Sequence, residues 1–342
     1  MLFTSDNWAG VHPKIMAALV DANGAPAPAY GGDDWTASVR AQFCELFETD
    51  CEVFFASTGG AANGLALAQI VPPFGATFCH EASHIQMDEC GLPEFYTGGA
   101  KLLTVAGEAG KIMPHALDQA MRVYAPAQAH HVKPSALSLT QATESGCVYT
   151  VAQVEALGVA AKKHHLKVHM DGARFANAVA ALGCTPAEIT WRAGVDVLCF
   201  GATKNGALAA EAVVFFNQAD TENFAWRHKR SGHVWSKGRF IAAQWSAFLA
   251  DGLWLDLAGH ANAMAARLSN GLRQAGCDVV YETQINEVFV VFPEGVADKL
   301  QAAGAQFYDW VYPGDQWDGR LKRLVTSYVT SEEDVDAFLA LL

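Results

Sequence analysis

An aspartate and a lysine each follow a short apolar run that is typical of a buried strand. Asp171 stands in the motif His-Met-Asp-Gly-Ala-Arg, directly after residues 166–170, and Lys204 comes thirty-three positions later, just beyond residues 195–200. A poorly solvated carboxylate needs a cationic partner, and a protonated pyridine nitrogen is one. A lysine among small neighbours is also poorly solvated, which favours the neutral amine that forms Schiff bases. Together the two residues point to pyridoxal phosphate.

Both residues also have simpler structural interpretations. Asp171 could cap a following helix or pair with Arg174, which comes three positions later. Lys204 could be an ordinary solvated charge, as most lysines are. The surface interpretation of Lys204 is weakened by its neighbours, Gly-Ala-Thr before it and Asn-Gly after it, because they are not polar enough for a surface loop.

A glycine-rich turn over residues 57–63 follows another apolar run and opens a helical stretch. Small side chains at Gly59 and Gly60 would let backbone N–H groups approach an anion, and a helix N-terminus favours a phosphate there. Tight packing alone also explains many such turns, and this one matches neither the P-loop nor the dinucleotide motif. Further along, His84 is either a flat ring stacked on a cofactor or a loop histidine bonded to its surroundings.

A competing motif occurs at His80-Glu81-Ala82-Ser83-His84, which fits the zinc-hydrolase pattern H-E-x-x-H, with Glu108 as a conceivable third ligand. That pattern binds zinc only on a helix, where both imidazoles share one face. Here the motif follows residues 76–79, which have the composition of a strand. We therefore expect no metal site.

These residues must be positioned by an alternation of strands and helices that begins near residue 50. Strands are expected at 52–56, 76–79, 136–140, 166–170, 195–200 and 212–216, and helices at 61–70 and 151–164. This alternation is typical of an α/β fold with a mainly parallel sheet. Because ligands bind beyond the carboxyl ends of such strands, the turn at residues 57–63, Asp171 and Lys204 should converge there.

The composition of the chain changes after about residue 245. A long helix is expected over 260–274, strands over 287–292 and 324–329, and a last helix beginning at Ser331, whose hydroxyl can cap it. We therefore expect three parts. They are an N-terminal segment over 1–25, a large α/β domain over 26–245 and a smaller C-terminal α+β domain over 246–342.

Charge and cysteine content exclude several classes of function. A formal net charge of −13 argues against nucleic-acid binding, which requires clustered basic residues. The basic cluster at 227–230 is short and suits a solvated face, a subunit contact or an anion site. The eight cysteines include no Cys-x-x-Cys pair, and no apolar run is long enough to cross a bilayer. We expect a cytoplasmic protein with reduced thiols and no membrane contact.

With these residues in view, the chain resembles the low-specificity L-threonine aldolases, which are pyridoxal-phosphate enzymes of fold type I. The most specific match is His-Met-Asp-Gly-Ala-Arg-Phe-Ala-Asn-Ala at 169–178, and the resemblance extends from Ser5-Asp6-Asn7 to residues 323–326. It implies a large, mainly parallel seven-stranded sheet domain and a smaller C-terminal domain. It also implies reversible retro-aldol cleavage of L-threonine, L-allo-threonine and related β-hydroxy-α-amino acids, such as phenylserine, to glycine and an aldehyde.

The resemblance also implies roles for individual residues. Lys204 would carry pyridoxal phosphate as a Schiff base, Asp171 would pair with the pyridine nitrogen, and His84 would stack on the ring and take part in catalysis. Guanidinium groups suit bidentate recognition of a carboxylate, and Arg174 would in addition lie beside the cofactor. The amides of Gly59 and Gly60 would bind the phosphate of the cofactor. The substrate carboxylate would be held by Arg174 and Arg323, with help from Ser5.

Further roles concern the substrate hydroxyl and the neighbouring subunit. His130 matches a family histidine near the substrate hydroxyl, with His131 or a water as alternative proton acceptors. Tyr30 matches a residue that reaches the phosphate or substrate of the neighbouring subunit, and Lys229 is assigned similarly. The resemblance thus implies a homodimer with shared active sites, assembled as a homotetramer.

The chain departs from the family pattern in its phosphate loop, where the usual Gly-Thr reads Gly59-Gly60. Thr58 or Thr203 would then replace the missing hydroxyl. Two other reactions of the same cofactor remain as alternatives, namely amino-acid racemisation and β-elimination. A zinc hydrolase that uses His80 and His84 is the more distant alternative, and a catalytically silent protein is disfavoured because the lysine, the aspartate and both arginines are present.

Overall fold

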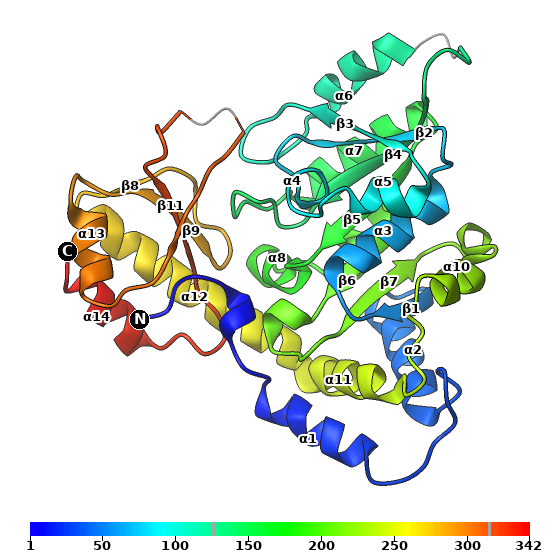
Figure 1. Ribbon diagram of the computed structural model, residues 1–342, viewed down its shortest axis with the longest axis horizontal. Helices are drawn as coiled ribbons and strands as arrows, with labels where there is room; N and C mark the ends of the chain where they lie inside the picture. Colours follow the sequence, from blue (N-terminus) through cyan, green and yellow to red (C-terminus); the bar gives the residue numbers. More distant parts are fainter. Residues whose placement is uncertain (125–127, 314–315) are drawn as a thin grey trace.

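The computed structural model describes residues 1–124, 128–313 and 316–342, and two sheets organise them. The larger sheet has seven strands in the order β1-β7-β6-β5-β4-β2-β3, and the smaller has four in the order β10-β11-β9-β8. Figure 1 shows the two sheets in separate lobes, with the long helix α12 running from one to the other. The predicted α/β class, with seven strands in the large sheet, is therefore confirmed.

The large sheet is mainly parallel, because only β7 runs against its neighbours. Its strands are β1 (Glu52–Ala56), β2 (Gly75–His80), β3 (Lys101–Val105), β4 (Lys133–Thr140), β5 (Lys167–Gly172), β6 (Val197–Gly201) and β7 (Glu211–Phe215). Six of them match predicted strands to within three residues at either end, and β3 was not predicted. This edge strand exposes Lys101 and alternates poorly, so it lacks the apolar run that marks a central strand.

Helices cover both faces of this sheet and place the core between them. The α-helices of the described residues are α1 (Pro13–Ala22), α2 (Asp34–Leu46), α3 (Gly59–Ile70), α4 (His84–Met87), α5 (Leu92–Thr97), α6 (Pro114–Met121), α7 (Val151–Lys163), α8 (Phe175–Leu182), α9 (Pro186–Ile189), α10 (Phe224–Arg230), α11 (Arg239–Leu249), α12 (Leu253–Gln274), α13 (Val296–Ala302) and α14 (Glu332–Leu339). Helix α3 contacts the central strands on one face, while α2, α7 and α8 contact strands of the same sheet. Residues 61–68 of α3 are all buried and nearly all are small or apolar, as is typical of a helix that is covered on every side.

Two close contacts anchor the elements that lead to the candidate site. Gly64 lets α3 approach α5, since a Cβ there would lie 2.3 Å from Leu92. On the opposite face, Phe200 at the end of β6 is fully buried and packs against a group of aromatic rings. These rings belong to Phe43, Phe47, Phe175, Trp245, Phe248 and Trp254. Removing such a side chain typically costs about 3–5 kcal/mol, so the end of β6 is held firmly.

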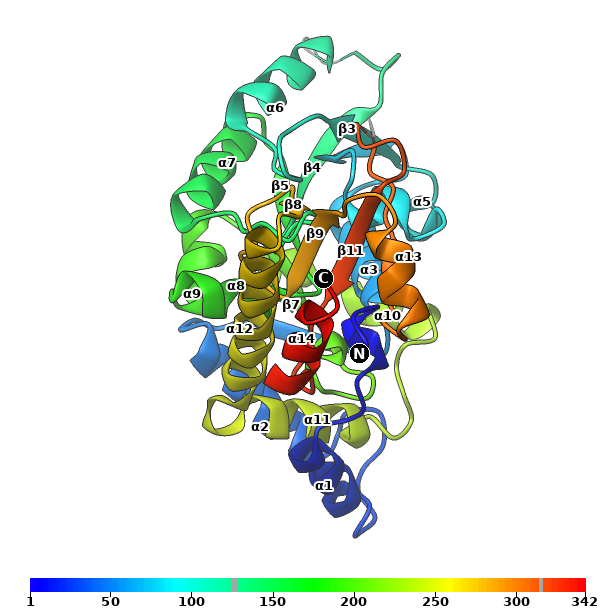
Figure 2. The same ribbon diagram turned by 90° about the vertical axis from the view of Figure 1, so that its left-hand side faces the viewer.

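The smaller lobe is an antiparallel sheet packed on helices, as Figure 2 shows from its own side. Its strands are β8 (Asp278–Val279), β9 (Glu287–Val291), β10 (Tyr308–Asp309) and β11 (Leu321–Val325). The N-terminus joins this lobe, because the Phe3 N–H donates to Gln306 and the Phe3 carbonyl accepts from Val325, both at 2.8 Å. Strand β11 begins three residues before the predicted strand at 324–329 and ends four residues before it ends.

The predicted division of the chain after residue 245 falls inside α11. This helix packs against α1 and α2 of the large lobe, so the observed change of lobe comes after Leu249. The division into three parts stays a prediction. Within the described residues, no helix combines the length and the apolar character needed to cross a membrane.

Candidate active site

A cavity of about 270 Å³ lies at the carboxyl edge of the large sheet. Its walls come from the turn after β1, the start of α4, the end of β5, the loop after β6 and the start of β7. The residues that line it are Asn7, Ser57, Thr58, Gly59, Gly60, Asn63, His84, Glu89, Asp171, Ala173, Thr203, Lys204 and Glu211. The lysine, the aspartate and the glycine-rich turn therefore meet in one place, where the strand pattern leads us to expect them, and His84 joins them there.

One end of the cavity is built to receive an anion. Thr58 caps α3 by accepting a hydrogen bond from the Ala61 N–H at 3.4 Å, and Gly59 and Gly60 form the first residues of the helix. A Cβ added at Gly59 would lie 3.8 Å from Glu211, and one at Gly60 would lie 3.6 Å from Glu89. Both would therefore project toward cavity residues, so the glycines keep space open at a helix N-terminus, where an anion is favoured.

A hydrogen-bonded network at the other end fixes the aspartate and the histidine. Asp171 is buried and accepts hydrogen bonds from Asn63 at 2.9 Å and from the Ala173 N–H at 3.1 Å. The same Asn63 amide donates to Glu89 at 2.8 Å, and Glu89 in turn binds His84 Nδ1 at 2.9 Å. Asp171 and His84 are thus held through two intermediate side chains, with Oδ1 of Asn63 and Oε2 of Glu89 left without partners among the described residues.

His84 is charged at neutral pH in this environment. Burial disfavours the imidazolium, but the hydrogen bond to Glu89 and the negative charges of Glu144 and Asp171 outweigh burial and raise the pKa of His84 to about 9. About a third of the side chain remains exposed, toward the cavity. The imidazole therefore presents a flat, cationic face beside Asp171.

Lys204 stands in a single 3₁₀ turn, Thr203–Asn205, between β6 and β7. The Asn205 side chain donates to the Trp254 carbonyl at 2.8 Å, which ties the turn to α12. Gly206 ends it with φ of 97°, a conformation that side chains other than glycine rarely adopt. No carboxylate forms an ion pair with the Lys204 ammonium in the described part of the chain, so the amine is free to react with a ligand.

Glu211 lies opposite Lys204 and was not predicted as a site residue. Its carboxylate accepts a hydrogen bond from the Thr203 hydroxyl, which itself accepts from the Ala210 N–H at 3.2 Å. Burial raises the pKa of Glu211 to about 7, against the opposing effects of Thr203 and Lys204. Because the Thr203 hydroxyl proton is committed to Glu211, Thr58 is the better placed of the two threonines to bind an anion.

Arg174 points away from the cavity into a buried ionic cluster. Its Nε lies 2.8 Å and its Nη2 3.2 Å from the carboxylate of Asp6, and its Nη1 lies 3.2 Å from Glu287. Burial raises the pKa of Asp6, but the charges of Arg174 and Lys204 outweigh burial and hold it below its ordinary value. All three nitrogens of Arg174 therefore face protein carboxylates, so the structure does not leave Arg174 free for a substrate.

Arg323 has spare hydrogen-bonding capacity, unlike Arg174. It is mostly buried and stacks on Trp310 with its guanidinium carbon 4.0 Å from the ring centroid. Its Nη1 lies 3.8 Å from Glu287, too far for a strong hydrogen bond, and its Nε has no partner among the described residues. A buried, unpaired guanidinium N–H is costly unless a ligand satisfies it.

Ser5 and Asn7 both lie in the N-terminal segment beside this cluster. Ser5 caps the short turn Asp6–Trp8 by accepting a hydrogen bond from the Asn7 N–H at 3.2 Å. Asn7 lines the cavity, whereas Ser5 does not. Ser5 was the predicted substrate contact, and Asn7 was only part of the motif beside it.

His130 is far from the cavity within one chain. It is exposed, and it precedes β4, whose opposite end at Thr140 lies beside Asp171. The eight residues of β4 separate the two ends by roughly 25 Å at about 3.3 Å per residue. His130 therefore does not reach the lysine cavity of its own chain, and its contact with the substrate hydroxyl in a site shared between subunits stays a prediction. His131, whose ring packs against Tyr124, lies at the same edge.

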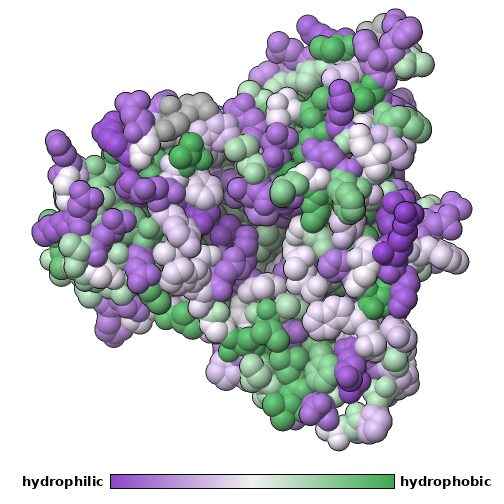
Figure 3. All heavy atoms as spheres, in the orientation of Figure 1, coloured by the Kyte–Doolittle hydropathy of each residue, from purple (hydrophilic) through white to green (hydrophobic). Residues whose placement is uncertain are grey.

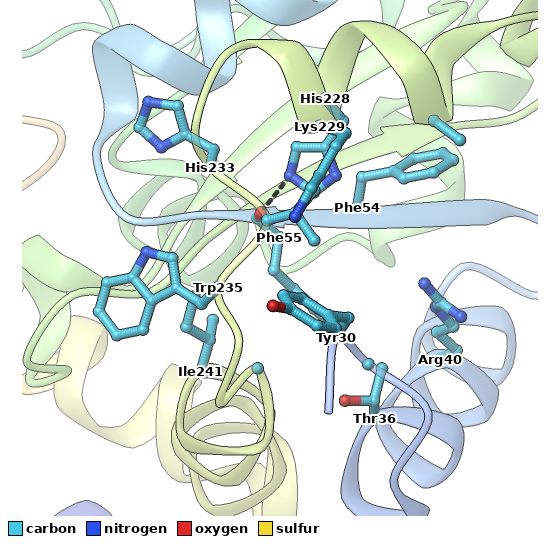
Figure 4. A pocket seen from close by; sticks show the side chains of 14 residues that line it. Tyr30, Thr36, Arg40, Phe54, Phe55, His228, Lys229, His233, Trp235 and Ile241 are labelled. Carbon is cyan, nitrogen blue, oxygen red and sulfur yellow. Dashed lines mark hydrogen bonds between the residues drawn. The ribbon is translucent and has the colours of Figure 1, made fainter. Parts of the chain in front are cut away.

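Tyr30 and Lys229 line a second cavity, of about 240 Å³. Figure 4 shows Tyr30 beneath the Lys229 side chain, and the Lys229 ammonium lies 4.4 Å from the ring centroid. His233, from the same wall, is 3.3 Å from the Ser57 hydroxyl, which also lines the lysine cavity. Neither Tyr30 nor Lys229 lines the lysine cavity of its own chain, and their role toward a neighbouring subunit stays a prediction.

The zinc interpretation of the H-E-x-x-H motif is wrong. His80 ends β2 and His84 begins α4, so the two rings do not share a helix face. Both nitrogens of His80 are also occupied, one beside the Gly107 carbonyl at 3.1 Å and the other accepting from the Ala82 N–H at 3.0 Å.

Comparisons with known proteins agree with this geometry. Residues 3–294 match the model of the beta-eliminating lyase family. The chain is 44% identical over 313 residues to a low specificity L-threonine aldolase of a Pseudomonas species, covering 91% of this chain and 90% of the relative. It is also 44% identical over 329 residues to the enzyme of that name from Pseudomonas aeruginosa, covering 94% of each. A solved threonine aldolase of Leishmania major is similar in structure, with a TM-score of 0.93, 28% identity and coverage of 99% and 98%.

Proposed function

This chain belongs to the low-specificity L-threonine aldolases within the beta-eliminating lyase family, and from that premise we propose a role for each side chain of the lysine cavity. The reaction is the reversible cleavage of L-threonine, L-allo-threonine and related β-hydroxy-α-amino acids to glycine and an aldehyde. The enzyme is a lyase that depends on pyridoxal phosphate. One observation carries the proposal for the site: Lys204, Asp171 and the N-terminus of α3 line the same cavity.

The residues of the cavity fit pyridoxal phosphate. The amide groups of Gly59 and Gly60 would hold the phosphate with the Thr58 hydroxyl, because the glycines keep the space at the helix N-terminus open. Lys204 would hold the aldehyde carbon, and Asp171 the ring nitrogen. When bound, the cofactor supplies a protonated ring that accepts electron density from the substrate Cα.

The network around Asp171 would keep this carboxylate directed at the ring. Asn63 donates to Asp171 and to Glu89 at once, so the two carboxylates are separated by a shared donor. His84 would lie against the face of the ring, positioned by its bond to Glu89. Its raised pKa favours the imidazolium at neutral pH, and as an imidazolium it can donate a hydrogen bond to a substrate oxygen.

Arg323 would bind the substrate carboxylate. Its unpaired Nε is the one buried guanidinium donor without a partner in the described residues. Arg323 does not line the lysine cavity itself but lies near Glu287, which also pairs with Arg174. Arg174 would not bind the substrate carboxylate, which is the role that the family resemblance implies for it. Locked by Asp6 and Glu287, it would hold the N-terminal segment in place and add positive charge near the substrate.

We propose that the enzyme works as a cytoplasmic homo-oligomer with active sites shared between subunits. Tyr30 and Lys229 line a surface cavity beside Ser57, from which they could meet a second subunit. Apolar residues also gather over α1 and α11 on the face seen in Figure 3. Met16 and Val20 of α1 are 45% and 66% exposed, a surface that suits burial against another copy.

A substrate panel tests the reaction. Purified protein, with and without added pyridoxal phosphate, is incubated with L-threonine, L-allo-threonine and phenylserine, and glycine and aldehyde are measured. We expect cofactor-dependent release of both products in equal amounts. D-alanine from L-alanine would indicate a racemase instead, and pyruvate with ammonia from L-serine would indicate a β-eliminating lyase.

A further inference from the structure

Glu144 lies in a turn that hydrogen bonds hold rigidly at the edge of the active site. The Gly146 N–H donates to the Thr143 carbonyl at 2.9 Å, and the Thr143 hydroxyl donates to the Ala109 carbonyl, also at 2.9 Å. The next residue, Ser145, donates to the Tyr312 hydroxyl at 3.0 Å, which ties the turn to the smaller lobe. The backbone at Glu144 is therefore fixed on both sides.

The carboxyl group of Glu144 has no partner of its own. It is partly buried and makes neither a hydrogen bond nor an ion pair with any described residue. The other acids around the active site differ, because Asp6, Glu89 and Glu211 are each bonded to a neighbour. Glu144 instead lines a cavity of about 160 Å³ with Ala82, Met87, Asp88, Trp310, Val311, Tyr312 and Pro313.

This cavity lies beside His84, because Ala82 and Met87 flank that histidine along the chain. The charge of Glu144 interacts with those of His84, Lys204 and Arg174, and it is repelled by Glu287. The remaining titratable groups of the cavity wall are Asp88, which is exposed, and Tyr312. Glu144 therefore lies within electrostatic range of both His84 and Lys204, in a cavity next to His84 that is separate from the lysine cavity. A substrate that extends beyond Cα past His84 would enter this cavity.

We propose that Glu144 is the catalytic base that removes the proton of the substrate β-hydroxyl, an inference that rests on the aldolase function proposed above. The O–H bond breaks and its proton moves to the Glu144 carboxylate. The electron pair of that bond forms the aldehyde C=O, and the Cα–Cβ pair stays with Cα, which is protonated in a later step to give glycine. In the direction of synthesis, the neutral Glu144 carboxyl returns the proton to the aldehyde oxygen.

Two features of the site favour this assignment. His84 is mostly protonated at neutral pH, and His130 lies at the opposite edge of the sheet of its own chain, so Glu144 is the better placed proton acceptor within one chain. Burial raises the pKa of Glu144 above its ordinary value and outweighs the attraction of His84. A carboxylate with a raised pKa is a stronger base, and general-base catalysis is most effective when the pKa approaches the working pH.

The test compares two reactions of the same holoenzyme. Cleavage of L-threonine needs a base at the β-hydroxyl, whereas exchange of a glycine α-hydrogen in deuterated water does not. We expect Glu144→Gln to lower the kcat of cleavage by about 100-fold or more, the usual contribution of a general base, while glycine exchange followed by proton NMR changes less than about threefold. Glu108→Gln is the matched control, since it removes an exposed acid next to Ala109, which holds the same turn, and both its rates should stay near those of wild type.

Two further measurements exclude a merely structural effect. In Glu144→Ala, formate can enter the enlarged cavity and should restore part of the cleavage rate without affecting exchange. We also expect kcat/KM of wild type to fall at low pH as Glu144 becomes protonated, and this loss should disappear in Glu144→Gln. Cleavage within about threefold of wild type, or a parallel loss of cleavage and exchange with no rescue by formate, would overturn the assignment. If wild type itself releases no aldehyde, the proposed function fails and not the role of Glu144.

Discussion

The hydrogen bond between Glu89 and His84 gives the sharpest prediction about the electrostatics of the active site. Glu89 is buried and accepts from His84 Nδ1 at 2.9 Å, and this bond is the largest of the effects that raise the pKa of the histidine. Glu89→Gln keeps the shape of the side chain but removes the charge. Burial then dominates, and we expect the pKa of His84 to fall from about 9 to its ordinary 6.5 or lower.

The change in charge at His84 is large at mildly alkaline pH. With a pKa of about 9, His84 is protonated in roughly ten of eleven molecules at pH 8. With a pKa of 6.5, only about one molecule in thirty carries the proton at that pH. The variant should therefore lose the cationic face beside Asp171 under ordinary assay conditions, and cleavage of L-threonine should fall with it.

Heteronuclear NMR of the apoenzyme, labelled with ¹⁵N-histidine, measures the change directly. A His84→Asn spectrum identifies the signals of this residue among the twelve histidines. Glu81→Gln is the control, because it removes a charge three residues from His84 without touching a hydrogen bond to it. A His84 titration in Glu89→Gln that still centres near pH 9 would refute the reasoning.

The raised pKa of His84 also affects the free energy of unfolding. A pKa raised in the folded state contributes stability below the unfolded value of 6.5, and this contribution is lost as the pH rises through about 9. The melting temperature of the wild-type apoenzyme should therefore fall more steeply between pH 7 and 9 than that of Glu89→Gln. If the melting temperatures of the two proteins fall equally between pH 7 and 9, the hydrogen bond to Glu89 is not what keeps His84 protonated.

Three further predictions concern the surroundings of the cavity. Asp6→Asn leaves the buried Arg174 with Glu287 as its remaining partner and should lower the free energy of unfolding by about 3 kcal/mol in urea titrations, whereas a loss below about 1 kcal/mol would show that Glu287 suffices. Arg323→Lys cannot offer a planar fork, so KM for L-threonine should rise about tenfold with little change in melting temperature, and an unchanged KM would assign the carboxylate to another group. Because His80 is bonded on both nitrogens, a chelator such as EDTA should leave aldehyde release unchanged, and inhibition reversed by zinc would reinstate a metal site.

The site residues that could be predicted from the sequence are those that come directly after a strand in the chain. Asp171 and Lys204 stand just after apolar runs, and the glycine-rich turn opens a helix, so the rule for parallel sheets was enough to bring them together. Glu211 has a similar origin, because it begins β7 and is the single acid in an otherwise apolar strand. The predicted strand started one residue later, which left Glu211 out of the candidate site.

Other site residues could not be predicted because their roles depend on contacts between distant segments. Asn63 joins Glu89, twenty-six positions away, to Asp171, 108 positions away. Glu287 lies in an apolar stretch of the smaller lobe, where nothing local signals its partner Arg174. The position of His130 shows the converse, since a motif match gives the order of residues along the chain but not the edge of the sheet at which they lie in one chain.

Borohydride reduction of the holoenzyme, followed by peptide mapping, tests the central claim most directly. Reduction converts the bond between pyridoxal phosphate and its lysine into a stable one, so mass spectrometry locates the attachment. The structure predicts a single phosphopyridoxyl group on Lys204, loss of the yellow colour and complete loss of L-threonine cleavage, with no label in Lys204→Ala. A label on another lysine, or a colourless protein that cleaves L-threonine without the cofactor, would contradict it.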